Sequence, residues 1–276
     1  MAQPPHHICD TTVAAPQCWE LEPRARAAAD CSFIHRVVCI SLREDAARRE
    51  NLATMLTAMG ITPTFKIVDR HPEGGRRGCF ASHVEVAQEA ARDGVRTLLV
   101  FEDDARAGRP LADVDLRELR AFCASPAMQE QDGLLLLGFL LWPGVTRITK
   151  LSGFERIKRA THAYTTHAYL LGARGIDTMA NRMVWAGEHI DKVATGRGCK
   201  SMFVPYILTP ILFYQCDCGT SVTPEMLPLQ RLIGFKKLMD THLWLAENTA
   251  AWATALSITL AVILTLAIAI PLARKK

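Results

Sequence analysis

The chain has 276 residues, enough for one or two domains with a buried core. Its 32 basic and 28 acidic residues leave a net charge of only +4, and the basic residues form no long block, which argues against nucleic acid as a partner. Hydrophobic residues make up 49% of the chain, and the position of the most apolar segment has to be found.

The nine cysteines are scattered, and no two CxxC pairs stand at the spacing of a zinc site. The first 30 residues lack the basic-then-apolar pattern of a signal peptide. We therefore expect mostly reduced cysteines and a folded domain in the cytosol.

Strand and helix patterns alternate through the first half of the chain. Residues 1–32 show no sustained period and are expected to form a flexible N-terminal segment. β-Branched runs and helical apolar spacing then predict strand, helix, strand, helix and strand at 35–41, 43–60, 62–69, 79–94 and 95–104, with a glycine-containing loop at 71–78. Helix-length connections between the strands predict parallel pairing with right-handed crossovers.

The carboxyl ends of these strands are the expected place for a ligand, because open α/β sheets bind ligands there. The three strands end at Ser41–Arg43, Asp69–His71 and Glu102–Asp104. We expect these three segments to face one site.

The second half of the chain is less regular. A continuous apolar run predicts a central strand at 133–141, and a strand running into a helix is expected at 166–184. Two prolines exclude a helix from 202–215, which should be extended. A short helix is predicted at 236–248.

The apolar excess lies at the end of the chain. Residues 250–273 contain no charge over 24 positions, and an α-helix of about 20 apolar residues spans a bilayer. Trp244 and Trp252 stand where interfacial aromatic residues belong, and 274–276 are basic. We predict a single-pass C-terminal membrane anchor with the folded domain on the cytosolic side.

Three consecutive carboxylates follow the apolar end of the third strand, at Glu102, Asp103 and Asp104. Carboxylate oxygens suit Mg²⁺ or Mn²⁺, and such an ion offsets the repulsion among them and keeps positions for phosphate oxygens. A solvated acidic turn is the alternative reading of the same triplet.

Several segments together resemble glycosyltransferase family 25, which includes lipooligosaccharide and collagen galactosyltransferases. They are "VVCISLREDAARREN", "GRRGCFASHVEVAQEA", "TLLVFEDD" and "THAYLLGARG", and the resemblance covers roughly Arg36 to Gln215. It implies an α/β fold of the GT-A type, a nucleotide-sugar donor, an inverting transfer and commonly Mn²⁺. The spacing of "GCFASH" and "FEDD" is its most specific part.

The resemblance also implies roles for single residues. Arginines after the first strand are expected to meet the donor diphosphate, Asp69 the ribose or base, and the "GCFASH" segment a phosphate or the donor sugar at a helix start. The implied substrate-binding residues are Ser41, Leu42, Arg43, Arg48, Asp69, Gly78, Ser82, His83 and Glu102. Arg49 is more simply explained by the polar face of the first helix, and Cys79 by packing.

Two departures from the family pattern border this expected donor site. Arg76 stands where the family usually has an acid, and Arg70 where it has a glycine. The loop Asp69–Gly78 is also shorter than usual. These changes leave the sugar specificity and the activity itself open.

The expected metal ligands are Asp103 and Asp104, with a histidine, His189 or His242, as an unresolved further candidate. An inverting transfer needs a base for the acceptor hydroxyl, and a carboxylate suits that role. We assign Asp191 to it, with Glu188 as second choice.

The sequence therefore predicts a flexible segment at 1–32, a catalytic domain at 33–235, a juxtamembrane helix at 236–249 and an anchor at 250–273. The predicted activity is metal-dependent transfer of a hexose, galactose or glucose, from a UDP-sugar to a glycan, lipid-linked glycan or protein hydroxyl. A catalytically inactive scaffold at a membrane is the alternative. A metal-dependent phosphohydrolase ranks last, because it gives no account of "GCFASH".

Overall fold

The computed structural model describes residues 30–142, 145–196, 201–216 and 235–248. Its first half contains β1 (Arg36–Leu42), α1 (Ala46–Ala58), β2 (Thr64–Val68), α2 (Gly75–Arg92), β3 (Thr97–Glu102), β4 (Ala105–Ala107), α3 (Asp113–Cys123), α4 (Pro126–Gln129) and β5 (Gly133–Leu136). The remainder contains β6 (Ile148–Lys150), β7 (Ile157–Ala160), β8 (Ala168–Gly172), α5 (Ala173–Arg182), α6 (Ile190–Thr195), β9 (Val204–Leu208), β10 (Phe213–Gln215) and α8 (Phe235–Glu247).

Eight strands form one mixed sheet in the order β2-β1-β3-β8-β5-β9-β7-β6, and β10 pairs with β4 in a small second sheet. The parallel pairing of β1 with β2 and β3 confirms the predicted first half. β8 and β7 run opposite to the other six strands, so the sheet is parallel in its main direction with two reversed strands.

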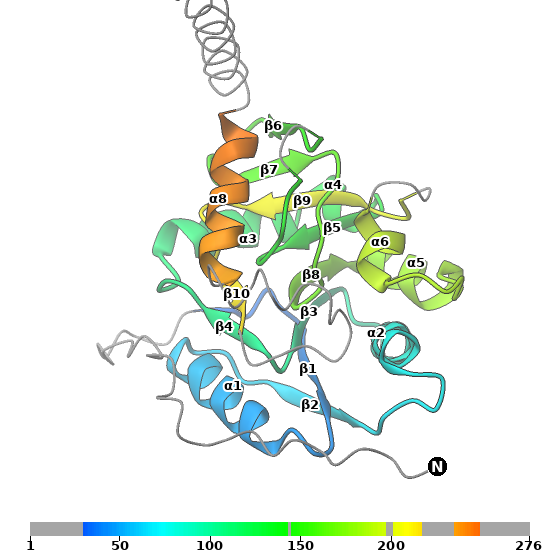
Figure 1. Cartoon of the computed structure of the whole chain (residues 1–276). Coiled ribbons are helices and arrows are strands. Elements are labelled where there is room, and N and C mark those ends of the chain that lie inside the picture. Colours follow the sequence, from blue (N-terminus) through cyan, green and yellow to red (C-terminus); the bar gives the residue numbers. More distant parts are fainter. Residues whose placement is uncertain (1–29, 143–144, 197–200, 217–234, 249–276) are drawn as a thin grey trace, which may run out of the picture.

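Helices cover both faces of the sheet. One apolar core joins the sheet to α2, α5, α6 and α8, and the other joins it to α1, α3 and α4. The strand β3 contributes to both cores: Leu98 and Val100 belong to the first, and Leu99 and Phe101 to the second. A strand buried on both faces reads as a continuous apolar run. In Figure 1, α1 and α2 lie on opposite sides of β1.

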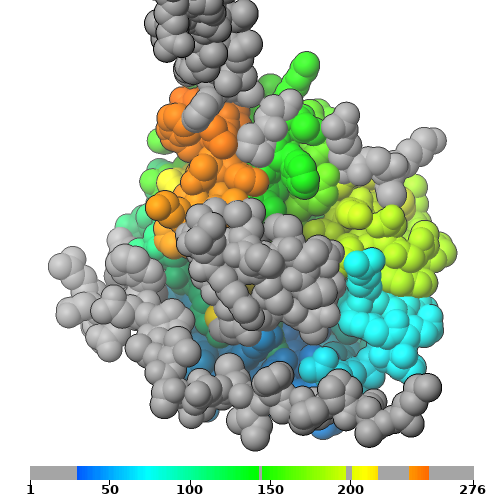
Figure 2. All heavy atoms as spheres, viewed as in Figure 1, coloured from blue at the N-terminus to red at the C-terminus, as the bar shows by residue number. Residues whose placement is uncertain are grey.

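The helix predicted at 236–248 is present as α8, and its buried Leu238, Met239 and Leu243 belong to the core that also contains α2. The space-filling view shows α8 in orange, and α2 in cyan beside α5 in yellow-green (Figure 2). The predicted anchor at 250–273 and nearly all of the segment 1–32 lie outside the described residues. Within the described part of the chain, no helix has the length and apolar character needed to cross a bilayer.

Other predictions need correction. The strand predicted at 133–141 ends at Leu136, and helices α3 and α4 and the hairpin β6–β7 were not predicted. The extended run at 202–215 is divided between β9 and β10, which belong to different sheets. Among the described cysteines, Cys31, Cys39, Cys79 and Cys123 are free, as expected for mostly reduced cysteines, whereas Cys216 is disulfide-bonded.

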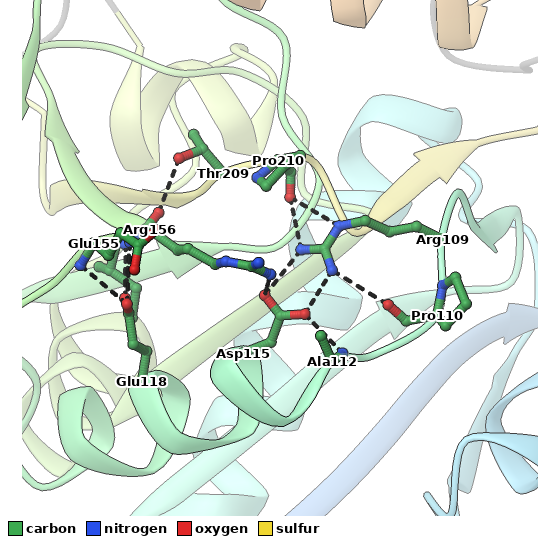
Figure 3. Close-up of polar contacts among 10 residues, drawn as sticks. Arg109, Pro110, Ala112, Asp115, Glu118, Glu155, Arg156, Thr209 and Pro210 are labelled. Atoms are coloured by element: carbon green, nitrogen blue, oxygen red, sulfur yellow. Dashed lines mark hydrogen bonds and ion pairs between the residues drawn. The ribbon is translucent and has the colours of Figure 1, made fainter.

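A buried ionic network fastens α3 to the strands β7 and β9 (Figure 3). The Asp115 carboxylate, fully buried, accepts hydrogen bonds from Arg109 at 2.5 and 3.1 Å, from Arg156 at 2.8 Å and from the Ala112 amide at 2.8 Å. Burial opposes ionisation of Asp115, but these donors outweigh it and lower its pKa. One turn later, Glu118 accepts backbone amides of residues 155–157. The network fixes α3 without contributing to the cleft described below.

Asp115→Ala should lower the free energy of unfolding by about 3 kcal/mol, because it leaves Arg109 and Arg156 without their shared buried partner. Denaturant unfolding of the two proteins measures this difference. Asp113→Ala, an exposed change in the first turn of the same helix, is the matched control and should cost less than about 1 kcal/mol. Equal effects of the two changes would contradict the structural role of Asp115.

Candidate functional site

A cleft of about 830 Å³ opens at the carboxyl ends of β1, β2 and β3. The adjacency of these strands places the predicted segments together, as expected from the parallel pairing. Most predicted site residues line it, namely Ser41, Leu42, Arg48, Asp69, Gly78, Ser82, His83, Glu102, Asp103, Asp104 and Asp191. Arg43 and Glu188 are not among the described residues that line it.

The reversed strand β8 supplies a wall of the cleft that the sequence did not predict. Because β8 is antiparallel to β3, its amino end lies at the carboxyl end of β3, and the Glu102 amide donates to the His167 carbonyl at 3.0 Å. Thr165, Thr166 and His167 therefore line the cleft beside the acidic triplet.

Glu102 is half-buried at the wall of the cleft, where neighbouring polar side chains hold it in place. It accepts the Thr166 hydroxyl at 2.8 Å and lies 3.3 Å from Nε2 of His83. Burial opposes its ionisation, yet His83 and Thr166 outweigh that effect and lower the pKa of Glu102. Glu102 is therefore an oriented anion that lines the cleft.

Asp103 is oriented by residues of β1 and α1. Its Oδ2 accepts the Ser41 hydroxyl at 2.5 Å, and its Oδ1 lies 3.4 Å from an Nη1 nitrogen of Arg48. Burial raises the pKa of Asp103 in spite of both partners. Ser41 and Arg48 thus act on this carboxylate, in addition to lining the cleft.

Asp104 is the least compensated of the three carboxylates. Its Oδ2 accepts the side-chain amide of Gln215 at 2.8 Å, whereas its buried Oδ1 has no hydrogen-bond partner among the described residues. Burial and the nearby Glu102 charge raise the pKa of Asp104 to about 7. A buried acceptor oxygen without a donor is costly, and a cation would satisfy it. The residues therefore fit a hard divalent metal ion bound at Asp104 Oδ1, with Asp103 beside it.

The arginines after β1 serve different ends. Arg49 donates to the Leu42 carbonyl and, at 3.1 Å, to the Ser41 hydroxyl, so it holds the loop that follows β1. Arg43 and Asp69, expected to contact the donor, instead pair with each other at 2.7 Å at an exposed rim. Arg48, by contrast, lines the cleft next to Asp103.

The helix that carries "GCFASH" begins earlier than predicted. Gly74 adopts φ +96° and precedes α2, which starts at Gly75, so half of the predicted loop is helical. The Gly78 amide donates to the Gly74 carbonyl at 3.0 Å, and the Ser82 hydroxyl donates to the Gly78 carbonyl. The Gly78 amide is therefore used within the helix, and the amides of the first turn, near Gly75 and Arg76, are the ones that an anion in the cleft would find.

His83 lines the cleft but is almost completely buried. Its Nδ1 lies 2.8 Å from the Tyr169 hydroxyl and its Nε2 faces Glu102. Cys79, one turn earlier, also lines the cleft. Burial, together with the charges of Glu102 and Asp191, raises the pKa of the Cys79 thiol, which argues against a nucleophilic role.

The structure separates the two candidates for a base. Asp191 lines the cleft and accepts the Thr165 amide at 3.3 Å, and burial raises its pKa. The backbone of Thr165 has φ 79°, a left-handed conformation that costs free energy for a residue other than glycine. Such strained residues cluster at functional sites. Glu188 pairs with Lys192 at 3.0 Å, which lowers its pKa. Of the two carboxylates, Asp191 is the one that lines the cleft in the described part of the chain.

The two candidate histidines are also separated. His189 lines the cleft, immediately before α6. His242 lies on α8, 2.6 Å from the Leu141 carbonyl, and is not among the described residues that line the cleft.

Sequence reasoning missed Thr166 and Gln215, which contact two of the three acidic side chains. Gln215 reaches Asp104 because β10 pairs with β4, which places Gln215 opposite Ala105. These contacts join residues 64 and 111 positions apart, and no local pattern signals them.

No protein-family model and no curated protein matches the chain. Among solved structures, the chain is similar to a protein from STIV, with a TM-score of 0.41 and 10% identity over 65% of this chain and 85% of that chain. A glycosyltransferase involved in the glycosylation of the major capsid of PBCV-1 aligns with a TM-score of 0.32 and 7% identity over 58% and 74%. UDP-glucose pyrophosphorylase complexed with UDP-glucose aligns with a TM-score of 0.37 and 10% identity over 71% of this chain and 81% of that chain. Values at this level assign the chain to no family, and the resemblance to glycosyltransferase family 25 stays a prediction.

The stability of the metal-free protein should fall as the pH rises, because Asp104 has a folded-state pKa of about 7 against a usual value of 3.8. Below the unfolded-state pKa the carboxyl is protonated in both states, and its burial does not lower the stability of the fold. As the pH rises from the unfolded-state pKa through the folded-state pKa, the folded protein must bury a charge, and that stability is lost. The loss is roughly 4 kcal/mol at most, since one pKa unit corresponds to about 1.4 kcal/mol. Asp104→Asn should remove this dependence.

Thermal unfolding of both proteins in a chelator, between about pH 5 and pH 8, measures the effect. Asp177→Asn, an exposed change on α5, is the matched control and should behave like the parent protein. A constant difference between parent and Asp104→Asn across this range would contradict the burial of an uncompensated Asp104.

Proposed function

We propose that the chain is a metal-dependent glycosyltransferase that binds a nucleotide-sugar donor in the cleft. The observation that carries this proposal is the unpartnered, buried Oδ1 of Asp104 beside Asp103, at the carboxyl edge of the sheet. Oxygen ligands in such a place suit Mn²⁺ or Mg²⁺, and bound metal neutralises the charge of a departing diphosphate.

The surroundings of this carboxylate pair support an anionic ligand. Arg48, His71 and Arg76 line the cleft together with the first residues of α2, whose amides favour a phosphate group. The volume of about 830 Å³ lies in the range of small-molecule sites and leaves room for a nucleotide and a sugar. Asp103 and Asp104 would hold the metal, and Arg48 would share the charge of the diphosphate.

The transfer step is proposed to invert the sugar, with Asp191 as base. Asp191 would take the proton of the acceptor hydroxyl while the diphosphate leaves from the opposite face of the sugar. Its raised pKa brings the carboxylate closer to the range in which a base works at neutral pH. The Thr165 amide donates a hydrogen bond to the Asp191 carboxylate and orients it, but takes no part in the reaction itself.

The finer assignments rest on the resemblance to glycosyltransferase family 25. They are a UDP-hexose donor, galactose or glucose, and a glycan, lipid-linked glycan or protein hydroxyl as acceptor. An anchor at 250–273, outside the described residues, would hold the domain on the cytosolic side of a membrane and near its acceptor.

A scaffold without activity is the second candidate. Arg43 and Asp69, both expected to contact the donor, pair with each other at 2.7 Å. Arg70, which departs from the family pattern, pairs with Glu44 at 2.6 Å. Release of UDP, GDP or CMP from a panel of nucleotide sugars with Mn²⁺ distinguishes the two. No release from any donor would favour the scaffold.

Asp104→Asn should abolish Mn²⁺-dependent binding of nucleoside diphosphate and lower turnover at least about 100-fold, because the amide supplies no charge to the metal. Calorimetric titration of UDP with and without Mn²⁺ measures binding. Asp177→Asn on α5 is the control and should bind as the parent does. Unchanged metal-dependent binding in Asp104→Asn would refute the metal assignment.

Asp191→Asn should lower turnover by about 10²–10⁴-fold while donor binding is retained, as expected for loss of a general base. Glu188→Gln, three residues earlier and paired with Lys192, should stay within about threefold of the parent. Initial rates and donor affinity are measured for both variants. If Glu188→Gln is the slower enzyme, the assignment of the base is wrong.

A further inference from the structure

A second group of potential metal ligands lies in the cleft, apart from the pair Asp103 and Asp104. Ligand atoms of Cys79, His83 and Glu102 all lie within 4.8 Å of one another, and Nε2 of His83 is 3.3 Å from Oε1 of Glu102. All three residues line the cleft. Ligand atoms in a tetrahedral zinc site are separated by roughly 3–4 Å, so only a small contraction around an ion is required.

The backbone holds these three residues in a fixed relation. Cys79 and His83 are four residues apart on α2 and therefore share one face of the helix. Glu102 ends β3, an interior strand of the sheet whose apolar residues are fully buried. A site whose ligands come from a long helix and a buried strand is already organised before an ion binds.

Contacts outside the three ligands also suit a metal. The Tyr169 hydroxyl lies 2.8 Å from Nδ1 of His83 and donates to the sulfur of Met179 at 3.6 Å, so it can accept a proton from Nδ1. With zinc bound, Nδ1 would carry the proton and donate it to Tyr169, and the Nε2 lone pair would face the ion, since metal-bound histidines commonly donate their other nitrogen in this way. Thr166 donates to Glu102 at 2.8 Å and orients that carboxylate.

We propose that Cys79, His83 and Glu102 form a zinc site whose fourth position is open to the cleft. One sulfur, one nitrogen and one oxygen ligand suit Zn²⁺ better than Mn²⁺ or Mg²⁺, which prefer all-oxygen sites. A thiolate and a carboxylate balance the two charges of the ion, so the buried site is neutral when occupied. Three protein ligands with an open position are typical of zinc that binds a water or an anionic ligand.

The site differs in chemistry from Asp103 and Asp104, and it stands whether or not the chain transfers a sugar. Its binding step exchanges the Cys79 thiol proton for Zn²⁺, and the proton passes to solvent. No oxidant or further reactant is needed.

Cobalt titration of the full-length protein in detergent, after removal of metals by a chelator, tests the site. We expect one equivalent of Co²⁺ to produce a thiolate-to-cobalt charge-transfer band and the visible absorption of four-coordinate cobalt, both displaced by one equivalent of Zn²⁺. Cys79→Ser should remove the charge-transfer band and weaken Zn²⁺ binding at least 10-fold. Cys31→Ser, at another half-buried free cysteine, is the matched control and should retain both.

Asp104→Asn separates this inference from the proposed function. It should keep the charge-transfer band even though it loses Mn²⁺-dependent nucleotide binding. Absence of the band in the parent protein, or a band that survives Cys79→Ser, would overturn the zinc site. If Cys79→Ser does not fold, X-ray absorption of the zinc-loaded parent decides, because one sulfur neighbour at about 2.3 Å is expected and a shell of only oxygen and nitrogen refutes the proposal.

Discussion

The crowding of three consecutive carboxylates, one half-buried and two buried, at the end of β3 is the constraint on which the cleft depends. Each carboxylate is compensated differently. Glu102 accepts the Thr166 hydroxyl and lies beside His83, and Asp103 is held by Ser41 and Arg48. Asp104 is compensated only in part, by Gln215. Since like charges in a poorly solvated place repel strongly, the incomplete compensation at Asp104 is the physical reason to expect a cation there.

The order of the strands explains how so many distant segments reach this triplet. β1 and β2 lie beside β3 in parallel, so the loops that follow them open at the same edge. β8 enters from the opposite direction and brings its first residues to that edge, and β10 reaches it through its pairing with β4. The ion pairs around Asp115 hold α3 against another part of the sheet, so the rigid frame and the cleft are separate.

Part of the candidate site could be predicted because its residues stand at strand ends or on one helix face. Ser41 and Asp103 stand at such strand ends, whereas His83 was expected from the resemblance to glycosyltransferase family 25, and all three line the cleft. The pairing of Arg43 with Asp69 and the contact of Gln215 with Asp104 could not be predicted, because the partners are 26 and 111 positions apart. A charged side chain indicates that it needs a partner, but its neighbours in space decide which one it finds.

The sequence by itself determined the alternation of strands and helices in the first half, the parallel pairing there, and the acidic end of β3, since hydrophobic periodicity and turn residues act over a few positions. Only the tertiary structure decided the reversed direction of β8, the early start of α2 and the division of Cys79, His83, Glu102, Asp103 and Asp104 into two chemically different groups. Those features depend on packing and hydrogen bonds between segments far apart in the chain. Their stability comes from surface that is buried only when these segments meet, so no single segment indicates it.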